Sequence, residues 1–285
     1  MDVPKWREAA SVIIATETRD GRYEVCMVKR SINSRLFPGQ YVFPGGSLDP
    51  SDEVAGHFDT LSGDNSNALK ACAIREVFEE SGISLSDHSN DGSTDLIPMC
   101  TWITPIELAS TIKGGFENTF FFAKVHRDVK ASGGPDGVET NEVVWISPGS
   151  DVYINTIMRL LPMPQLYIMT ELSNCPRVDQ LEDYVRTLHR GIFRYPFQPF
   201  KIPINQQEFA YVLPGDQSHD KYRALSGYAW EHRSIFRISN SGEIHFAFRR
   251  SPGLVEVARK SAETNSEWCV KAKLTDSRLY LGGYG

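Results

Sequence analysis

Three carboxylates within five residues are the part of this chain that most directly suggests chemistry. In the run REVFEE at 75–80, a helix that turns by about 100° per residue places Glu76, Glu79 and Glu80 within an arc of roughly 100°. Like charges at these spacings destabilise a helix by about 0.2–0.5 kcal/mol per pair, unless cations neutralise them. Oxygen ligands favour Mg²⁺ or Mn²⁺ over zinc, and Mg²⁺ commonly shares its ligands with substrate phosphates. The alternative is a solvated acidic face on an amphipathic helix.

The surrounding residues predict a short helix after a tight turn. Ser66 or Asn67 can cap the start of the helix, and Gly82 stands where a left-handed C-terminal residue is favoured. Upstream, the glycines of the run FPGG at 43–46 allow the backbone to approach a ligand closely. We expect this turn and the carboxylates to meet at one site. The side of the helix roughly opposite the carboxylates is expected to carry Ile74, Val77 and Phe78.

The nine residues from Arg75 to Ile83 resemble the second half of the Nudix hydrolase signature, Arg-Glu-aliphatic-x-Glu-Glu-x-Gly-aliphatic. In that family the signature opens with a Gly, five residues and a Glu, followed by seven residues before the Arg. Gly46 resembles the opening glycine, but counting back from Arg75 places Asn67 at the Glu, and extra residues intervene after Gly46. Glu53 is an alternative for that carboxylate. The resemblance implies that Glu76, Glu79, Glu80 and the carbonyl of Gly46 bind Mg²⁺ or Mn²⁺, with Arg75 as an orienting residue.

A second pattern resembles the coenzyme A diphosphatases of that family, a peroxisomal group. Two arginines and a glycine precede the FPGG turn at the spacing of their signature, although residues 26–29 depart from its leading Leu-Leu-Thr-x. One guanidinium group can bind two phosphate oxygens at once, which suits a substrate with a diphosphate and a 3′-phosphate. The substrate-binding residues implied by this resemblance are Arg30, Arg35, Gly39, Phe43, Gly45 and Gly46.

The function implied by the resemblance is metal-dependent cleavage of the diphosphate of coenzyme A and acyl-coenzyme A, to 3′,5′-ADP and phosphopantetheine or its acyl ester. The general base is left open between Glu142 and Glu117. Trp102 and Phe116 can stack on adenine, but aromatic residues near strands more often fill the core, and we favour that role. The alternatives are a Nudix pyrophosphatase for ADP-ribose, NADH or capped RNA, and a nucleotide-binding module without catalysis, suggested by Asn67.

Composition narrows the class of protein. The chain has 285 residues, and its net charge of −6 argues against broad, sequence-independent nucleic-acid binding. The sequence contains no apolar run of about 18 residues, so we expect no membrane span. Five scattered cysteines indicate neither a disulfide framework nor a zinc site. We expect a protein of a reducing intracellular compartment, peroxisomal by family resemblance or cytoplasmic, with a homodimer as one possible assembly.

The run Ser277-Arg278-Leu279 has the composition of a peroxisomal address, but six residues follow it. The sequence as written therefore predicts no terminal targeting signal.

Hydrophobic patterning predicts an α/β protein in two parts. We expect a Nudix core at 1–150, with an insertion after Gly46, and a C-terminal α+β extension at 151–285 packed on it. The resemblance implies an α/β/α sandwich around a mixed β-sheet for the core. In the extension, apolar spacing from Leu181 predicts a helix that Gly191 ends. Predicted strands are 11–16 and 23–28, joined by a hairpin at Asp20-Gly21, then 41–43, 99–103, 118–125, 142–146, 208–213, 235–238 and 243–248.

Overall fold

The structure is a computed structural model of the 285-residue chain. It describes residues 6–34, 36–55, 66–85, 96–111, 114–126, 140–155, 157–214, 216, 218–219, 232–238, 243–250 and 268–273. The sequence also predicts a polar loop at 87–94 and a flexible turn at 133–137, and both lie outside these residues.

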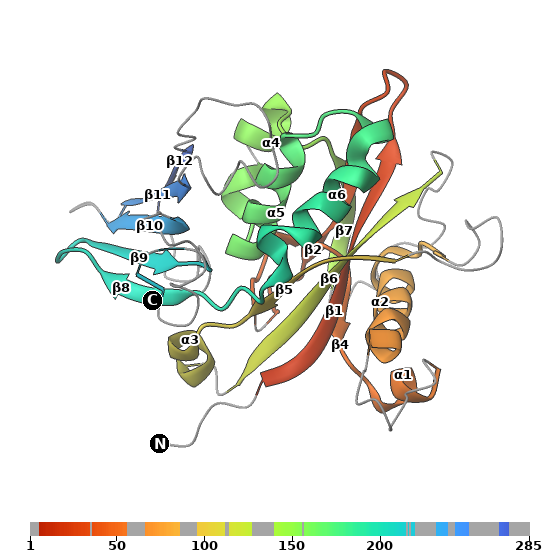
Figure 1. The fold of residues 1–285 in the computed structure, drawn as a ribbon, viewed down its shortest axis with the longest axis horizontal. Coiled ribbons are helices and arrows are strands. Elements are labelled where there is room, and N and C mark those ends of the chain that lie inside the picture. Colours follow the sequence, from red (N-terminus) through yellow and green to blue (C-terminus); the bar gives the residue numbers. More distant parts are fainter. Residues whose placement is uncertain are drawn as a thin grey trace.

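A seven-stranded mixed sheet forms the centre of the molecule (Figure 1). Its strands are β1 (Trp6–Glu17), β2 (Tyr23–Arg30), β3 (Tyr41–Val42), β4 (Gly45–Ser47), β5 (Ile97–Ile103), β6 (Gly115–Val125) and β7 (Thr140–Ile146). They follow the order β3-β2-β1-β6-β5, with β4 also paired to β1 and β7 to β2. β1 and β6 run parallel, and the other pairs are antiparallel. The predicted hairpin is confirmed, since Ala15 pairs with Val25 and Gly21 has a φ of 75°.

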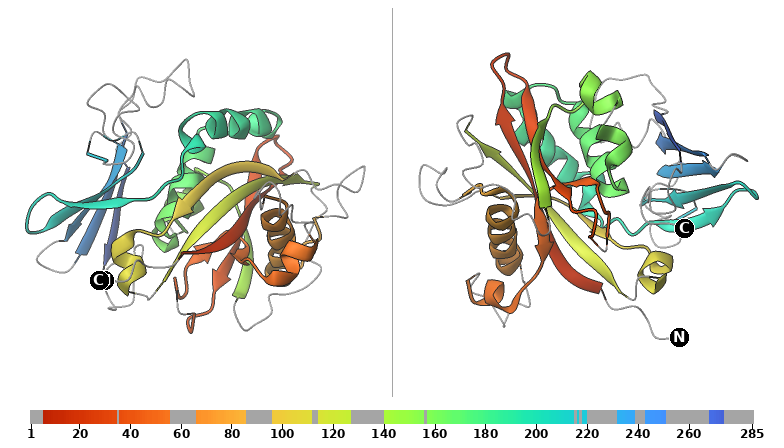
Figure 2. Two further views of the ribbon diagram at one scale, coloured as in Figure 1. Left: turned by 60° about the horizontal axis from the view of Figure 1, so that its bottom comes forward. Right: turned by 180° about the vertical axis from the view of Figure 1, so that it is seen from behind.

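Helices cover both faces of this sheet (Figure 2). The helices are α1 (Pro50–Ala55), α2 (Ser66–Ser81), α3 (Ile106–Thr111), α4 (Asp151–Asn155), α5 (Met163–Ser173) and α6 (Leu181–Arg190), with 3₁₀ turns at Ile157–Leu160, Val178–Gln180 and Ile192–Arg194. Val12 and Ile14 of β1 pack in the cluster with α2, whereas Ile13 and Ala15 pack in the cluster with α5 and α6. Because both faces are covered, β1 reads as a continuous apolar run rather than an alternating one. The predicted α/β/α sandwich is confirmed.

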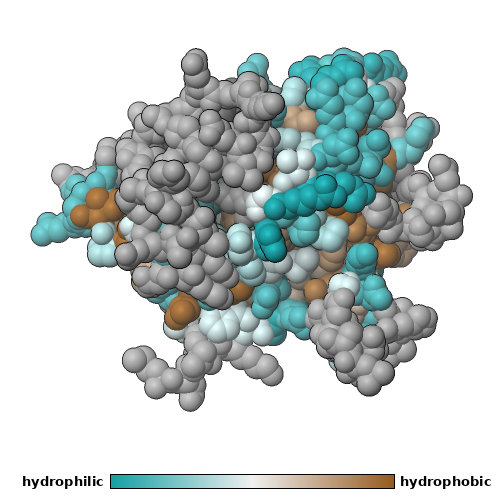
Figure 3. Space-filling view, in the orientation of Figure 1, coloured by the Kyte–Doolittle hydropathy of each residue, from teal (hydrophilic) through white to brown (hydrophobic). Residues whose placement is uncertain are grey.

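Of the two longest C-terminal helices, the sequence predicts α6 but not α5. α6 has apolar residues on one face, is bounded by Gly191 as predicted, and presents hydrophilic residues to solvent (Figure 3). α5 was not predicted, because most of its residues are buried and no polar stripe marks a helical period. Its Tyr167 packs edge-on against Trp102 and Phe197, with ring centroids 5.7 and 5.4 Å away. Trp102 is therefore buried in the core, as favoured, and it also lines the cavity described below.

A second sheet of five antiparallel strands follows α6. Its strands are β8 (Phe200–Pro203), β9 (Glu208–Val212), β10 (His232–Ile238), β11 (Glu243–Arg250) and β12 (Trp268–Lys273), in the order β12-β11-β10-β9-β8. The strands predicted at 208–213, 235–238 and 243–248 are confirmed. β8 and β12 were not predicted, and both are short edge strands.

Two sets of contacts attach this region to the first sheet. The backbone of Phe197 bonds to Thr101 and Ile103 at 2.7 and 2.8 Å. His232 of β10 bonds through Nε2 to the hydroxyl of Tyr167 on α5, at 2.9 Å. These contacts bring the C-terminal residues to the edge of the sheet where the candidate site lies. Within the described residues, no helix combines the length and apolar character needed to cross a membrane.

A buried ion pair stabilises the turn before β10, and its removal is our first prediction. Asp216 is fully buried and accepts two hydrogen bonds from Arg233, each 2.8 Å long. In Asp216→Asn the arginine loses its counterion, so the free energy of unfolding, measured by urea denaturation, should fall by about 3–5 kcal/mol. The control is Asp179→Asn, whose partner Arg177 is exposed, and it should cost less than about 1 kcal/mol. Equal losses in both variants would contradict the prediction.

Candidate active site

A short helix before the extra residues positions a carboxylate that the sequence analysis did not assign. Asp49 accepts a bond from the N–H of Ser51, and Asp52 accepts one from the N–H of Asp49, both at 2.9 Å. With Pro50 in the first turn, this reciprocal pair is a capping box that fixes the start of α1. The box holds the Asp52 side chain, which is buried, toward α2.

Arg75 joins this carboxylate to those of α2. Its guanidinium donates in a fork to Asp52, with Nε to Oδ1 at 2.9 Å and Nη2 to Oδ2 at 2.8 Å. Its Nη1 atom donates to Glu76 at 2.9 Å and to Glu79 at 3.0 Å, and Nη2 also reaches the carbonyl of Ser47 at 3.3 Å. The hydrogen bonds that Arg75 donates to Asp52 and Glu76 raise its pKa, the bond to Asp52 most of all. One guanidinium therefore orients α1, α2 and β4 together.

Asp52 also corrects the alignment with the Nudix signature. Counting forward from Gly46 by the five residues of the signature leads to Asp52, an aspartate in place of the family's first Glu. The extra residues therefore lie between Asp52 and Arg75. Counting back from Arg75 led to Asn67 because that count runs through the extra residues, which the signature does not contain. Glu53, the other alternative, is exposed at its side chain.

The two glycines of the turn allow close contact with α2. The N–H of Gly45 donates to Oε2 of Glu80 at 2.9 Å, and Glu80 is 4% exposed. A Cβ atom on Gly46 would collide with the carboxyl group of Glu76, so any other residue would displace this carboxylate from its present position. The expected meeting of turn and helix is confirmed for these two carboxylates. Gly82 ends the helix with a φ of 70°, also as expected.

The orientation of α2 differs from the sequence expectation. Glu76 and Glu80 lie on the face that packs toward β1 and β4, beside the buried Cys72 and Ala73. Phe78 lies on the side roughly opposite the carboxylates, as expected, and this side faces solvent there, since Phe78 is 58% exposed. The acidic arc and the packing face overlap because the glycine turn leaves space for carboxylates at this seam. Glu79 lies at the edge of the arc and is 56% exposed at its side chain.

The oxygen atoms of Glu76, Glu79 and Glu80 suit a hard divalent cation, but the three carboxylates do not converge on one point. Across the described ranges, no cluster of three or more His, Cys, Asp or Glu side chains is arranged to hold a metal ion. Glu76 and Glu79 both face Arg75, and Glu80 faces the N–H of Gly45. Carboxylates can accept several interactions at once, so these contacts are compatible with additional cation contacts. All the donors are oxygen atoms, as Mg²⁺ and Mn²⁺ prefer.

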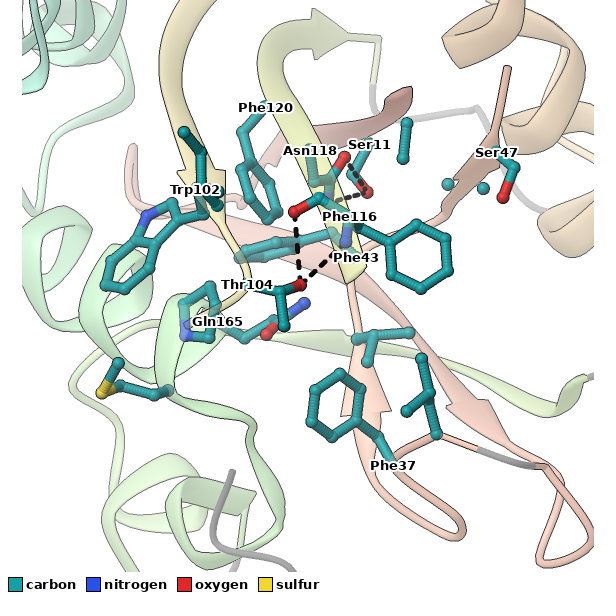
Figure 4. Close-up of a pocket in the computed structure, with 18 of the residues that line it drawn as sticks. Ser11, Phe37, Phe43, Ser47, Trp102, Thr104, Phe116, Asn118, Phe120 and Gln165 are labelled. Carbon is teal, nitrogen blue, oxygen red and sulfur yellow. Dashed lines mark hydrogen bonds between the residues drawn. The ribbon is translucent and has the colours of Figure 1, made fainter. Parts of the chain in front are cut away.

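A cavity of about 410 Å³ opens beside these carboxylates (Figure 4). Glu76, Gly46 and Ser47 line one part of it, and Met163, Pro164 and Gln165 of α5 line another. The wall also carries the aromatic side chains of Phe37, Phe43, Trp102, Phe116 and Phe120. The cavity thus combines residues of the first sheet with residues of the C-terminal region.

The loop after β2 carries the substrate-binding residues suggested by the second pattern. Arg30 lines the cavity, and its Nε donates to the carbonyl of Leu36 at 3.0 Å. Gly39 has a φ of 71° and donates its N–H to the carbonyl of Arg30 at 3.2 Å, so it shapes the loop. Phe43 and Gly45 also line the cavity. Arg35 lies outside the described residues.

The candidate bases lie away from the cavity lining. Glu142 on β7 is 49% exposed at its side chain, accepts a bond from Tyr41 at 3.3 Å and lies 3.8 Å from Lys29. Burial, followed by this carboxylate, raises the pKa of Tyr41. Glu117 on β6 is exposed. Neither glutamate belongs to the described residues that line the cavity, whereas Phe116 does.

Nearby thiols do not offer an alternative nucleophile. Burial raises the pKa of Cys26 and of Cys72 to about 12, so both remain protonated at neutral pH. Cys72 lies on α2, with Sγ 3.7 Å from the carbonyl of Gly46. The site therefore offers carboxylates rather than thiolates for chemistry.

The ion pair of Asp52 predicts a pH-dependent stability. Burial alone would raise the pKa of Asp52, but hydrogen bonds from Arg75 and Asp49 outweigh it, and the pKa is lowered. The stabilisation should therefore be present above the unfolded pKa of about 3.9 and disappear as the pH falls through the folded pKa. Urea denaturation of Asp52→Asn should show a loss of about 2–3 kcal/mol at pH 7 and a shrinking loss below about pH 4.

The control for this prediction is Glu53→Gln, which changes the neighbouring exposed carboxylate. It should leave the free energy of unfolding nearly unchanged. A loss in Asp52→Asn that stays constant from pH 7 to pH 3 would contradict the proposed role of the Arg75 pair.

Comparison with known proteins agrees with this geometry. The chain is similar to a Xenopus laevis protein named acyl-coenzyme A diphosphatase NUDT19, with 22% identity over 78% of this chain and 83% of that protein. A Caenorhabditis elegans protein named putative nudix hydrolase 7 is 29% identical, and the match covers 74% of each.

Similarity of fold and of domain sequence points the same way. A Nudix hydrolase structure from Alicyclobacillus acidocaldarius has a TM-score of 0.52 and 20% identity, over 64% of this chain and 97% of that chain. This likeness shows the fold. Residues 5–150, more than half of the 285, match the family model of the NUDIX domain. The chain therefore belongs to the Nudix hydrolase family.

Proposed function

We propose that this Nudix hydrolase cleaves the diphosphate of coenzyme A and acyl-coenzyme A. The products would be 3′,5′-ADP and 4′-phosphopantetheine or its acyl ester. The observation that carries the proposal is the arrangement of Glu76, Gly46 and Arg30 on the lining of one cavity, with the carboxylates of α2 held by Arg75. The Xenopus laevis relative, named for acyl-coenzyme A diphosphatase activity, supports this substrate class.

Nudix hydrolases generally use divalent cations, and Mg²⁺ or Mn²⁺ is the ion we propose here. Glu76, Glu79, Glu80 and the carbonyl of Gly46 would hold it. When bound, the ion would neutralise charge on the diphosphate and lower the pKa of a water molecule. Arg75 keeps the carboxylates in place through Asp52, and a contact of this kind commonly affects metal affinity or activity 10- to 100-fold.

Arg30 carries a positive charge on the cavity lining, and we propose that it binds substrate phosphate. Its Nε holds the loop at Leu36, so the same side chain would couple the position of the loop to the position of the phosphate. Arg35 is proposed as a second contact by its place in the pattern. The general base stays a prediction, because Glu142 and Glu117 do not line the cavity. The peroxisomal location implied by the resemblance also stays a prediction.

A second enzymatic function keeps the same site but changes the substrate to ADP-ribose, NADH or a capped RNA. The cavity includes aromatic walls that would accept a nucleotide from any of these. A nucleotide-binding module without catalysis is less favoured. It was suggested by Asn67 at the position of the family's first Glu, and we propose that Asp52 takes the place of that Glu.

Product analysis separates these functions. Purified protein is incubated with coenzyme A, acetyl-coenzyme A, ADP-ribose and NADH, first with Mg²⁺ and then with Mn²⁺, and the products are resolved by chromatography. We expect metal-dependent 3′,5′-ADP from the coenzyme A substrates. Glu76→Gln and Glu79→Gln should each lower kcat by roughly 100-fold or more, because each removes a charge proposed to bind the cation.

The matched control is Glu182→Gln on α6, whose ion pair with Lys124 is solvent-exposed. It should retain wild-type kcat. Turnover of ADP-ribose or NADH alone would reassign the substrate. Nucleotide binding without turnover of any of the four compounds would contradict the enzymatic proposal and favour the binding module.

A further inference from the structure

One residue of the cavity lining, Gln165, carries a buried amide oxygen that no described residue pairs. Gln165 lies in the first turn of α5 and is 6% exposed. Its Oε1 atom has no hydrogen-bond partner among the residues that the structure describes. Buried carbonyl oxygens are nearly always paired, and an unpaired one is unfavourable for the folded state. Gln165 also lines the cavity, so a bound ligand that brings an N–H or O–H group would satisfy this oxygen once the amide turns toward the cavity.

The surroundings of the amide favour a flat aromatic ligand. Figure 4 shows Gln165 and Thr104 in the cavity, with Trp102, Phe43 and Phe116 around them. Aromatic rings gain stacking or edge-to-face contacts from such walls beyond simple burial. Thr104 contributes to the shape of this wall, because its Oγ1 accepts a bond from the N–H of Phe116 at 2.9 Å.

Phe37 adds a further aromatic side chain to the same cavity. Its φ of 53° lies in the left-handed region, which is rare for a bulky residue. Neighbouring contacts maintain this conformation, since Arg30 bonds to the carbonyl of Leu36 at 3.0 Å and Gln40 bonds to that of Phe37 at 3.2 Å. Strained residues concentrate at ligand sites, where the surrounding structure holds them in place. Phe37 is therefore placed for ligand contact at a conformational cost.

We propose that this part of the cavity binds the amino-purine base of the substrate, with Gln165 accepting a hydrogen bond from the exocyclic amino group. The inference rests on the proposed function, in which the substrate links adenosine to a diphosphate. A glutamine carboxamide matches adenine well, because it offers one acceptor and one donor side by side. Gln165 lies beyond residues 5–150, so the proposed hydrogen bond to the base comes from the C-terminal region, whereas most of the aromatic walls come from the matched domain.

The other half of coenzyme A is the competing occupant. Its pantetheine arm carries amide N–H groups that also suit an acceptor. That arm is flexible and not planar, so it gains less from aromatic walls and loses more conformational freedom on binding. The observations therefore favour the base, and the two halves of the substrate can be tested separately.

The test measures binding of adenine compounds against inosine compounds by isothermal titration calorimetry. Adenosine 3′,5′-bisphosphate and AMP are each compared with the inosine counterpart, in which a carbonyl oxygen replaces the amino group. We expect wild-type protein to bind the adenine member of each pair roughly 10- to 100-fold more tightly. Gln165→Leu should reduce this ratio to about one, because leucine has a similar size and no amide. Gln180→Leu, at an exposed glutamine, is the matched control and should keep the wild-type ratio.

Gln165→Met provides a second variant of similar length if the leucine variant does not fold, as judged by circular dichroism. A ratio that both folded variants leave unchanged would overturn the proposal, as would undetectable binding of both adenine compounds to the wild type. Binding of 4′-phosphopantetheine is measured in the same way. If Gln165→Leu weakens that binding, this part of the cavity belongs to the other half of the substrate, and the proposal is overturned. Since the readout is binding, failure of coenzyme A turnover alone would contradict only the proposed function.

Discussion

The geometry of the active site depends on the guanidinium of Arg75. This one cation contacts Asp52 on α1, Glu76 and Glu79 on α2, and the carbonyl of Ser47 on β4. Without it, carboxylates from two helices would repel one another at a partly buried seam. One positive charge does not neutralise them all, particularly with Glu80 buried beside Gly45. The remaining negative charge agrees with the divalent cations that Nudix hydrolases generally use.

The carboxylate helix and the glycine turn were predictable from sequence because their roles are local. Helical period places Glu76 and Glu80 on one arc, and Gly46 is required where a side chain would collide with Glu76. Asp52 was not found, because the extra residues before Arg75 disturbed the count that would have led to it. A signal was nevertheless present: the capping box from Asp49 to Asp52 and the forward count from Gly46 both indicate this residue.

The contribution of the C-terminal region could not be predicted in the same way. α5 carries no hydrophobic period, because its residues are buried between the first sheet and the second. Gln165 reaches the cavity only because Tyr167 and Phe197 pack α5 against Trp102 on β5, a set of long-range contacts with no local signature. The matched Nudix domain and the region after it thus share one cavity. The first carries Glu76, Arg30 and most of the aromatic walls, and the second adds Gln165.

The most direct test is a Mn²⁺ titration followed by electron paramagnetic resonance, with and without a coenzyme A analogue. In this analogue a methylene group replaces the bridging oxygen of the diphosphate, so that it resists hydrolysis. Because Arg75 already engages Glu76 and Glu79, we expect Mn²⁺ to bind weakly alone and more tightly when diphosphate oxygens supply additional ligands. Glu76→Gln should abolish that increase. An affinity for Mn²⁺ that neither the analogue nor this substitution changes would contradict the account.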